Sequence, residues 1–580
     1  AELIGNIMKV VDAVRDAGKI MVATGDVHHF YKDDRIYRQI IINTKANFGK
    51  HHLAKSSIKE IPSQHYRTTN EMLDNFNFLD KDVAYEIVVT NTNKICDMID
   101  EIEVIPDTGG TPFSPRVKAD DGKTYLDCPR VVTDLVYGRA TDWYGDPLPL
   151  LIEERIAKEL YGETVYKVCR ENLLKTHSED EPNLKELIFK DVHEVILKGV
   201  DAVKELVRNN IKEHLEEETS DEEIEQKLKK SLGGVIGAGF DPIYLIAQRL
   251  VKHSNDEGFL VGSRGSVGSS FVATMMGITE VNSLAAHYRC LKCKTSIFND
   301  EKGKPLGATY SCGIDLPEKK CPNCGEDMYR DGHDIPFETF LGFNADKVPD
   351  IDLNFSDLNQ ASAHEYTKVL FGVDNVYRAG TIGTVADKTA YGFVLGYFED
   401  KIMALINKVA KSVDKSVEDL LSVEKKEKPF KIAKKFLLLQ ESIRKNVPGD
   451  IESEYDEIVR KIKEYSTIRS AEIERISLGC VGVKRTTGQH PGGIVVVPDY
   501  MDVSDFTPFQ FPADDPNSAW RTTHFSYHAI DQDLLKLDIL GHSDPTQLRM
   551  IQDLTKTDIL KVPLDDKDTM SIFTTTKALG

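Results

Sequence analysis

One short stretch of the chain decides its fold: Val348-Pro349-Asp350-Ile351-Asp352-Leu353-Asn354-Phe355. Polar and apolar residues alternate in it with a period of two, which is the period of a β-strand. Asp350, Asp352 and Asn354 therefore share one face, and the apolar residues between them point into a core. Two carboxylates on one strand face repel each other unless a cation lies between them. The pattern predicts a strand that binds Mg²⁺, and the alternative is an exposed acidic edge strand.

A second segment repeats this arrangement further along the chain. It reads Leu534-Leu535-Lys536-Leu537-Asp538-Ile539-Leu540-Gly541, and its alternation places Lys536 and Asp538 together on the polar face. Two neighbouring strands of this kind offer three carboxylates, which is enough for a two-metal site. Such a site holds the attacking and the leaving oxygen of an in-line displacement, so the pair of segments indicates phosphoryl-transfer chemistry.

A glycine-rich segment at 258–270 is predicted to bind phosphate. An apolar strand leads into a turn, and an apolar stretch that could start a helix follows. The turn consists of Gly262, Ser263, Arg264, Gly265 and Ser266. Glycines let backbone N–H groups approach a phosphate, a helix N-terminus adds its dipole, and Arg264 offers a bidentate fork. The alternative interpretation is an ordinary glycine-rich turn.

Two further segments have a similar composition. Residues 381–388 predict a Gly-Thr turn followed by a helix that carries Lys388. Residues 482–493 contain Lys484, Arg485 and His490, and they predict an anion-binding loop that enters a strand starting at Ile494. Each segment alone is weak evidence, but three such segments together with the strand aspartates predict a phosphate-binding site.

Two Cys-x-x-Cys pairs predict a structural metal site. The pairs are Cys290 with Cys293 and Cys321 with Cys324. Four thiolates complete the tetrahedron of a structural Zn²⁺ ion, which is the arrangement of a zinc ribbon. The 27 residues between the pairs (294–320) predict an expanded loop, and Cys312 within it is a candidate spare or substitute ligand. The alternative is two pairs of reduced cysteines.

The composition is that of an ordinary globular protein. The chain has 580 residues, of which 41% are hydrophobic and 29% charged, and a net charge of −21. This balance disfavours a uniformly basic nucleic-acid binder but leaves room for a local basic cleft. We find no run of about 18 apolar residues and no signal peptide, so we expect a cytoplasmic protein that does not enter the membrane.

The remaining segments predict mainly helices. Residues 4–17 predict a helix and residues 20–24 a strand that ends at Asp26 and His28, a weak candidate metal pair whose alternative is a surface turn. Helices are also predicted in 66–104, 147–215 and 400–475. The charged blocks among them are interpreted as solvated faces. The chain begins without Met, and we expect a fragment of a longer protein.

These motifs resemble those of the C-family bacterial replicative DNA polymerases, in particular the Gram-positive PolC type of the DNA polymerase III alpha subunit. The resemblance rests, in the family's order, on 261–270, 349–355, 381–388, 484–493, 520–524 and 536–541. The four-cysteine element is specific to the PolC branch. The resemblance covers nearly the whole chain, although the charged stretches 163–230 and 400–465 look expanded.

The resemblance implies an α+β multidomain fold. Its centre would be a polymerase-beta-like nucleotidyltransferase palm with an inserted helical thumb and a Cys₄ zinc ribbon, preceded by the C-terminal part of a PHP α/β barrel. The implied boundaries are 1–104 for the end of the PHP domain with linker helices, 105–392 and 481–545 for the two parts of the palm, 393–480 for the thumb, and 546–580 for the start of the fingers. The palm would contain the charged insertion at about 163–230 and the zinc ribbon at 288–326.

The resemblance also implies roles for the candidate residues. Asp350, Asp352 and Asp538 would be the catalytic carboxylates and would ligate Mg²⁺. The turn formed by Gly262, Ser263, Arg264, Gly265 and Ser266 would hold the incoming triphosphate, and Lys388, Lys484, Arg485 and His490 would line the nucleotide or primer side. Asp26 and His28 would fall at a metal-ligand position of the PHP domain.

The implied activity is template-directed transfer of dNMP to a primer 3′-hydroxyl. Two Mg²⁺ ions, with Mn²⁺ as the alternative, and one structural Zn²⁺ would be the cofactors. Primer–template DNA and dNTPs would be the partners. The sliding clamp, other replisome components and a 3′→5′ exonuclease would involve regions outside this chain. Two alternatives stay open: a PHP-type metal-dependent phosphoesterase, and a zinc-containing nucleic-acid scaffold without catalytic activity.

Overall fold

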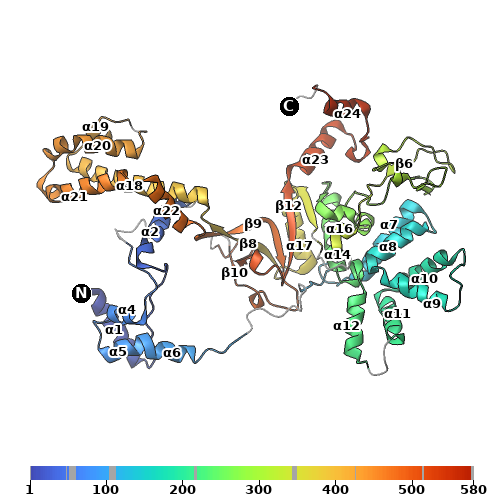
Figure 1. Ribbon diagram of the computed structural model, residues 1–580, viewed down its shortest axis with the longest axis horizontal. Coiled ribbons are helices and arrows are strands. Elements are labelled where there is room, and N and C mark those ends of the chain that lie inside the picture. The colour runs from blue at the N-terminus through green and yellow to red at the C-terminus, as the bar shows by residue number, and fades with distance from the viewer. Residues whose placement is uncertain are drawn as a thin grey trace. The chain divides into compact units, whose positions relative to one another are not determined.

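The computed structural model describes residues 2–46, 49–50, 61–102, 113–214, 219–342, 349, 351–424, 426–511 and 515–576. The chain divides into two compact units (Figure 1). Unit 1 comprises Ala1–Glu103 and Ile382–Thr487, and unit 2 comprises Val104–Thr381 and Gly488–Gly580. Each unit is described by itself.

A seven-stranded mixed sheet forms the centre of unit 2, with the strand order β10-β11-β8-β9-β12-β7-β3. Strand β12 is parallel to β7 and antiparallel to β9, and β3 is antiparallel to β7. The strands are β3 (Gly262–Arg264), β7 (Asp352–Ser356), β8 (Val376–Thr384), β9 (Lys484–Val496), β10 (Phe509–Gln510), β11 (Thr522–Ser526) and β12 (Leu535–His542). Both strands that were predicted to carry aspartates are therefore confirmed, and they are neighbours.

Alternation of polar and apolar residues explains which face of these strands is buried. Leu353 and Phe355 of β7 are 3% and 0% exposed, and Ile539 of β12 is 1% exposed. All three belong to the main core of unit 2, which also includes residues of α14 (Asp241–Asp256) and α17 (Gln360–Phe371). The helices therefore cover the apolar face of the sheet, and the aspartates lie on the other face.

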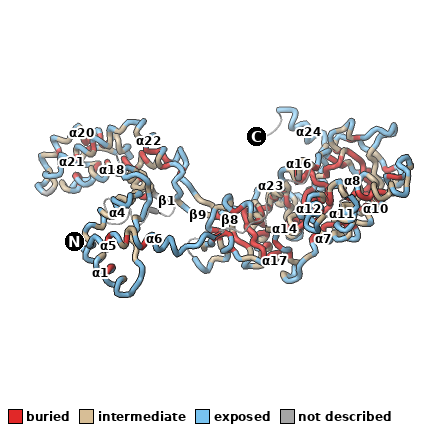
Figure 2. The backbone as a smooth tube through the Cα atoms, turned by 60° about the horizontal axis from the view of Figure 1, so that its bottom comes forward, coloured by how far each residue is buried: buried red, intermediate tan, exposed pale blue. Residues whose placement is uncertain are grey.

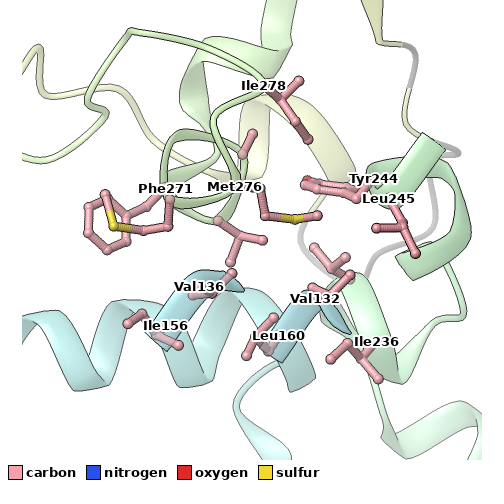
Figure 3. Packing of buried hydrophobic residues seen from close by; sticks show 14 of the residues in the cluster. Val132, Val136, Ile156, Leu160, Ile236, Tyr244, Leu245, Phe271, Met276 and Ile278 are labelled. Atoms are coloured by element: carbon pink, nitrogen blue, oxygen red, sulfur yellow. The ribbon is translucent and has the colours of Figure 1, made fainter. Parts of the chain in front are cut away.

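Helices supply most of the main core. Figure 3 shows Val132 and Val136 of α7 (Cys128–Tyr144) packed with Leu160 of α8 and Phe271 of α15. The other helices of unit 2 are α8 (Leu150–Tyr161), α9 (Thr164–Leu174), α10 (Leu184–Lys198), α11 (Val200–Glu213), α12 (Asp221–Ser231), α13 (Gly234–Gly237), α15 (Phe271–Met276), α16 (Glu338–Leu341), α23 (Ser543–Thr555) and α24 (Lys567–Thr574). The predicted amphipathic helices of 147–215 are confirmed.

A small three-stranded sheet in unit 2 has a core of its own. Its strand order is β5-β4-β6, with β4 (His287–Arg289), β5 (Ser296–Ile297) and β6 (Tyr329–Asp331). The core residues include Tyr288 and Met328 together with Cys290 and Cys321. This core is too small to stabilise a domain by burial alone, which agrees with a metal site there.

Unit 1 is largely helical, with buried residues along its helices (Figure 2), and two separate hydrophobic clusters lie among them. The first cluster lies among α18 to α21, and the second joins α18, α22 and α2. The helices are α1 (Glu2–Asp16), α2 (Arg35–Asn43), α4 (Thr69–Asn75), α5 (Lys81–Tyr85), α6 (Asn91–Cys96), α18 (Asp387–Ser412), α19 (Val417–Leu421), α20 (Pro429–Arg444), α21 (Gly449–Ser466) and α22 (Ser470–Cys480). The predicted helices of 4–17, 66–104 and 400–475 are confirmed. No helix in the described ranges is both long and apolar enough to span a membrane.

Three local predictions are wrong. Residues 20–24 form no strand, because Ala23 donates its backbone N–H to Ile87 of a helical turn and no strand lies beside it in the described part of the chain. Gly383 lies inside β8 and is not a turn, although α18 with Lys388 starts at Asp387 as predicted. Residues 484–493 belong to β9 and are not a loop. In the second and third cases, pairing with neighbouring strands holds a polar segment extended, and the local sequence does not show which strands will pair with it.

Asp241 makes the stability of unit 2 depend on pH. It is 6% exposed at the start of α14, and burial raises its pKa from 3.8 to about 7. A carboxyl whose pKa is raised by folding stabilises the fold fully below the unfolded pKa and loses this contribution as the pH rises to 7. The loss is at most about 1.4 kcal/mol per pH unit.

We therefore expect Asp241→Asn to flatten the decline in melting temperature between pH 5 and pH 7. The variant should also melt at a higher temperature than the unmodified chain at pH 8, because its amide does not ionise. Thermal melts across this range test the expectation, with the exposed Asp134→Asn as a control that leaves the profile unchanged. An unaltered profile in Asp241→Asn would contradict it.

Candidate active site on the mixed sheet

The register of three strands brings the candidate site residues to one face. Strands β7 and β12 pair Leu353 with Ile539, so the flanking Asp352 and Asp538 point to the same side of the sheet. Strands β3 and β7 pair Arg264 with Asp352. This polar face lies opposite the helices of the main core. Asp350 lies outside the described residues, so its predicted place in the site stays a prediction.

Each described aspartate of this face contacts a cation from its own chain. Arg264 Nη2 lies 3.2 Å from Asp352 Oδ2, and Lys536 Nζ lies 2.9 Å from Asp538 Oδ2. His490 Nδ1 is 3.9 Å from Asp538 Oδ1, too far for a hydrogen bond. Burial, followed by the Lys536 charge, lowers the pKa of His490. The two carboxylates therefore lie side by side only with positive charge next to each.

The oxygens of this face suit a hard divalent cation. Asn354 Oδ1 and Asp538 Oδ1 are buried, and neither has a hydrogen-bond partner among the described residues. A buried acceptor without a partner is unfavourable unless a ligand completes it. Carboxylate and amide oxygens are the ligands that Mg²⁺ takes in proteins. The donor set therefore fits the predicted magnesium site.

The glycine-rich segment differs in part from the prediction. Its strand is β3, which starts at Gly262, and a 3₁₀ turn (Gly265–Ser269) precedes α15. Gly265 has φ +78° and open space around it, so backbone can approach a ligand there. Arg264 is 58% exposed and can turn toward such a ligand, whereas the Ser263 hydroxyl is 2.7 Å from Thr279 Oγ1.

The helix N-terminus after this turn is already occupied, so its predicted role in phosphate binding is wrong. Glu159 of α8 accepts hydrogen bonds from the backbone N–H groups of Phe271 and Val272, at 3.0 and 2.9 Å. It also contacts Ser270 Oγ and Arg155, and it is fully buried. The sequence analysis missed Glu159, because its partners are distant in the chain and its local helical pattern is unremarkable.

The other predicted basic residues belong to unit 1. Lys388 and Lys484 are exposed. Arg485 donates to the Thr44 carbonyl at 3.1 Å and lies over the Phe393 ring at 4.8 Å. Their predicted roles at the nucleotide or primer stay predictions.

The four cysteines predicted to bind zinc lie together. The Sγ atoms of Cys290, Cys293, Cys321 and Cys324 are all within 4.8 Å of one another. The Cys293 backbone N–H points to Cys290 Sγ at 3.5 Å. Hydrogen bonds from the Thr295 side chain and backbone lower the pKa of Cys293 to about 6, which favours the thiolate that binds metal. This geometry fits a structural zinc ion.

The candidate PHP metal pair, Asp26 and His28, brings together fewer potential ligands than the cysteine cluster does. His28 Nε2 lies 3.1 Å from Asp26 Oδ1, and Gln64 contacts the second oxygen of Asp26. Within the described ranges, only the cysteine cluster gathers three or more His, Cys, Asp or Glu ligand atoms at metal-binding distance. The metal role of this pair stays a prediction, and the geometry does not favour the phosphoesterase alternative.

Comparison with known proteins gives a consistent family. The family model described as "Bacterial DNA polymerase III alpha NTPase domain" matches residues 201–541. The chain is similar to the protein "DNA polymerase III PolC-type" of Bacillus subtilis, with 41% identity over 580 residues, and of Staphylococcus epidermidis, with 42% over 572 residues. These alignments cover 100% and 99% of the chain but 29% of each relative, so the chain spans less than a third of their length.

The cysteine cluster yields a test that uses a neighbouring thiol as its control. We expect the purified chain to contain about one zinc ion, and Cys321→Ser to lose it, because three thiolates leave the tetrahedron open. Cys312 lies outside the cluster, so Cys312→Ser should keep the zinc. Metal analysis by mass spectrometry measures both. Equal zinc content in the two variants would refute a four-cysteine site.

Proposed function

Because the chain belongs to the bacterial DNA polymerase III alpha family, we propose that it is the catalytic region of a PolC-type DNA polymerase, which transfers dNMP to a primer 3′-hydroxyl. One observation carries this proposal. Asp352 and Asp538 extend from adjacent parallel strands to the same face, where unpaired buried oxygens accompany them. A zinc scaffold without catalytic activity would not need this arrangement.

We infer a domain assignment from the same geometry. The mixed sheet with α14 and α17 corresponds to a polymerase-beta-like palm. The helices α18 to α22 follow β8 and precede β9, so they are inserted between two strands of that sheet, as a thumb would be. Residues 1–104 correspond to the end of a PHP domain and 546–580 to the start of the fingers. The similarity to PolC-type relatives along the whole chain supports this assignment.

The mechanism follows from the charges on the polar face. When bound by Asp350, Asp352 and Asp538, two Mg²⁺ ions would activate the primer 3′-oxygen and neutralise the leaving pyrophosphate. Asp352 and Asp538 lie on the same face of neighbouring strands because the strand register aligns them. The proposed substrates, primer–template DNA and dNTP, approach this face, since the core helices cover the opposite one.

Arg264 and Lys536 also take part in this mechanism. In the free chain they neutralise Asp352 and Asp538, which limits the repulsion between the carboxylates. With Mg²⁺ bound to the carboxylates, Arg264 would be available to bind the triphosphate with its planar fork. The exposed position of Arg264 beside the open Gly265 turn permits this movement.

The central test is Asp352→Asn in the full-length product of the gene. We expect primer extension to fall by at least about a hundred-fold, because an amide neither carries the charge nor binds Mg²⁺ as a carboxylate does. Affinity for primer–template DNA, measured by fluorescence anisotropy, should change by less than about two-fold. Asp134→Asn removes an exposed carboxylate of α7 and should extend primers normally. Normal extension by Asp352→Asn would falsify the proposed function.

Arg264 provides a test of nucleotide binding. We expect Arg264→Ala to raise the KM for dNTP by about ten-fold, the effect of losing one charged hydrogen bond. Arg264→Lys should recover only part of this loss, because it lacks the bidentate fork. Steady-state primer extension at varied dNTP measures the constants. Arg208→Ala, which removes an arginine that pairs with Glu225, is the control. An unchanged KM in Arg264→Ala would exclude Arg264 from the triphosphate site.

A further inference from the structure

The ladder between β9 and β12 stops beside the proposed active site. It runs from the pair Leu535–Val496 to the pair Asp538–Gly493 and includes no later pair. Continuing the same register would place Pro491 opposite Leu540. Proline has no N–H group to donate, and it is unusual in a central strand for that reason. After Asp538, β12 is therefore paired with β7 on one side only, and on the side of β9 its backbone has no regular ladder.

Two side chains of α17 bind the backbone where this ladder ends. Gln360 Nε2 donates to the Ile539 carbonyl at 2.8 Å and to the Pro491 carbonyl at 3.2 Å. His364 Nε2 lies 3.2 Å from the same Ile539 carbonyl. Gln360 and His364 are four residues apart, so they lie on one face of the helix. They reach the strands from the core side of the sheet.

Both carbonyls belong to residues that directly follow a candidate site residue in the sequence. Ile539 follows Asp538, and Pro491 follows His490. Close packing shows how little room the strands leave there. A Cβ on Gly541 would lie 2.7 Å from Gln360 Oε1, and one on Gly492 would lie 2.7 Å from the Ile539 carbonyl oxygen. The half-buried amide of Gln360 therefore lies close to the backbone of both β9 and β12.

Arg378 of β8 determines which nitrogen of His364 donates. Its Nη1 lies 2.8 Å from His364 Nδ1 and 3.2 Å from Nε2. A guanidinium only donates, so the nearer nitrogen Nδ1 accepts, and the ring proton is on Nε2, which faces the Ile539 carbonyl. His364 is 3% exposed, so water does not compete for this bond.

We propose that Gln360 and His364 are positioning residues of the polymerase site: by binding the Ile539 and Pro491 carbonyls, they hold the part of β12 that presents Asp538 to the metal. The inference rests on the proposed function. Without these donors, only the ladder with β7 would hold the backbone of β12 beyond Asp538, and its side toward β9 could shift. The Asp538 carboxylate would then move relative to Asp352, and the affinity for the shared metal would fall.

Three substitutions isolate this role in the full-length product of the gene. Gln360→Met keeps the length of the side chain but removes the donor. His364→Gln places an amide N–H near the position of Nε2, whereas His364→Asn places its amide near Nδ1 and leaves the Ile539 carbonyl without this donor. Asp538→Asn serves as the reference that removes the metal ligand itself.

The readouts are Mn²⁺ binding, followed by electron paramagnetic resonance with the metal alone, and the melting temperature. We expect Asp538→Asn to abolish Mn²⁺ binding at this site. Gln360→Met and His364→Asn should each weaken the Mn²⁺ affinity by about ten-fold, which is the usual effect of losing a hydrogen bond that supports a metal ligand. Their melting temperatures should stay within about 2 °C of the unmodified chain. His364→Gln should bind Mn²⁺ normally, and the Mg²⁺ needed for half-maximal primer extension should follow the same order.

The possible results separate this inference from the proposed function. If Asp538→Asn loses Mn²⁺ but Gln360→Met and His364→Asn bind it normally, the positioning role alone is overturned. Equal losses in His364→Gln and His364→Asn, or losses that parallel a fall in melting temperature, also overturn it, because both indicate a purely structural role. If Asp538→Asn binds Mn²⁺ as the unmodified chain does, the metal site and the inference fail together.

Discussion

Repulsion between two carboxylates on adjacent strands is the constraint on which this structure depends. The parallel pairing of β7 with β12 forces Asp352 and Asp538 onto one face of the sheet. Such a pair is unstable without nearby positive charge. The chain meets this need with Arg264 and Lys536, which come from the strand beside β7 and from β12 itself. The same register that creates the repulsion thus delivers the cations, and it leaves buried oxygens free for a metal.

A buried carboxylate elsewhere in unit 2 is stabilised in a different way. Glu159 receives two backbone N–H groups at the start of α15 and a guanidinium from Arg155. These bonds saturate Glu159 and fix the helix that follows the glycine-rich turn. Asp538, in contrast, keeps one oxygen without a hydrogen bond. The difference separates a carboxylate that holds the fold from one that is available for chemistry.

Sequence patterns predicted those features whose cause is local. The alternation in β7 and β12, the helical periodicity of 400–475 and the spacing of the cysteines each depend on residues close in the chain. The extended conformation of 484–493 depends on its neighbouring strand β8, with β12 pairing only from Gly493 onward, and the sequence pattern there indicated a loop. The roles of Glu159, Gln360 and His364 could not be predicted, because the groups that these side chains bind are far away in the sequence. Distant polar contacts carry no periodic signal, so only the folded chain shows them.

The active-site strands combine features that weaken a sheet. Pro491 removes a ladder donor, and Gly493 leaves space that His490 Nδ1 fills, since a Cβ there would lie 2.8 Å from it. Between β9 and β12, strand pairing alone therefore leaves the backbone after Asp538 without hydrogen bonds from β9, and only β7 pairs with it. Side chains of α17 bind the backbone from the core side, so they do not occupy the polar face. Helix α17 therefore holds the strands from the core face of the sheet, and the polar face stays open for metal and nucleotide.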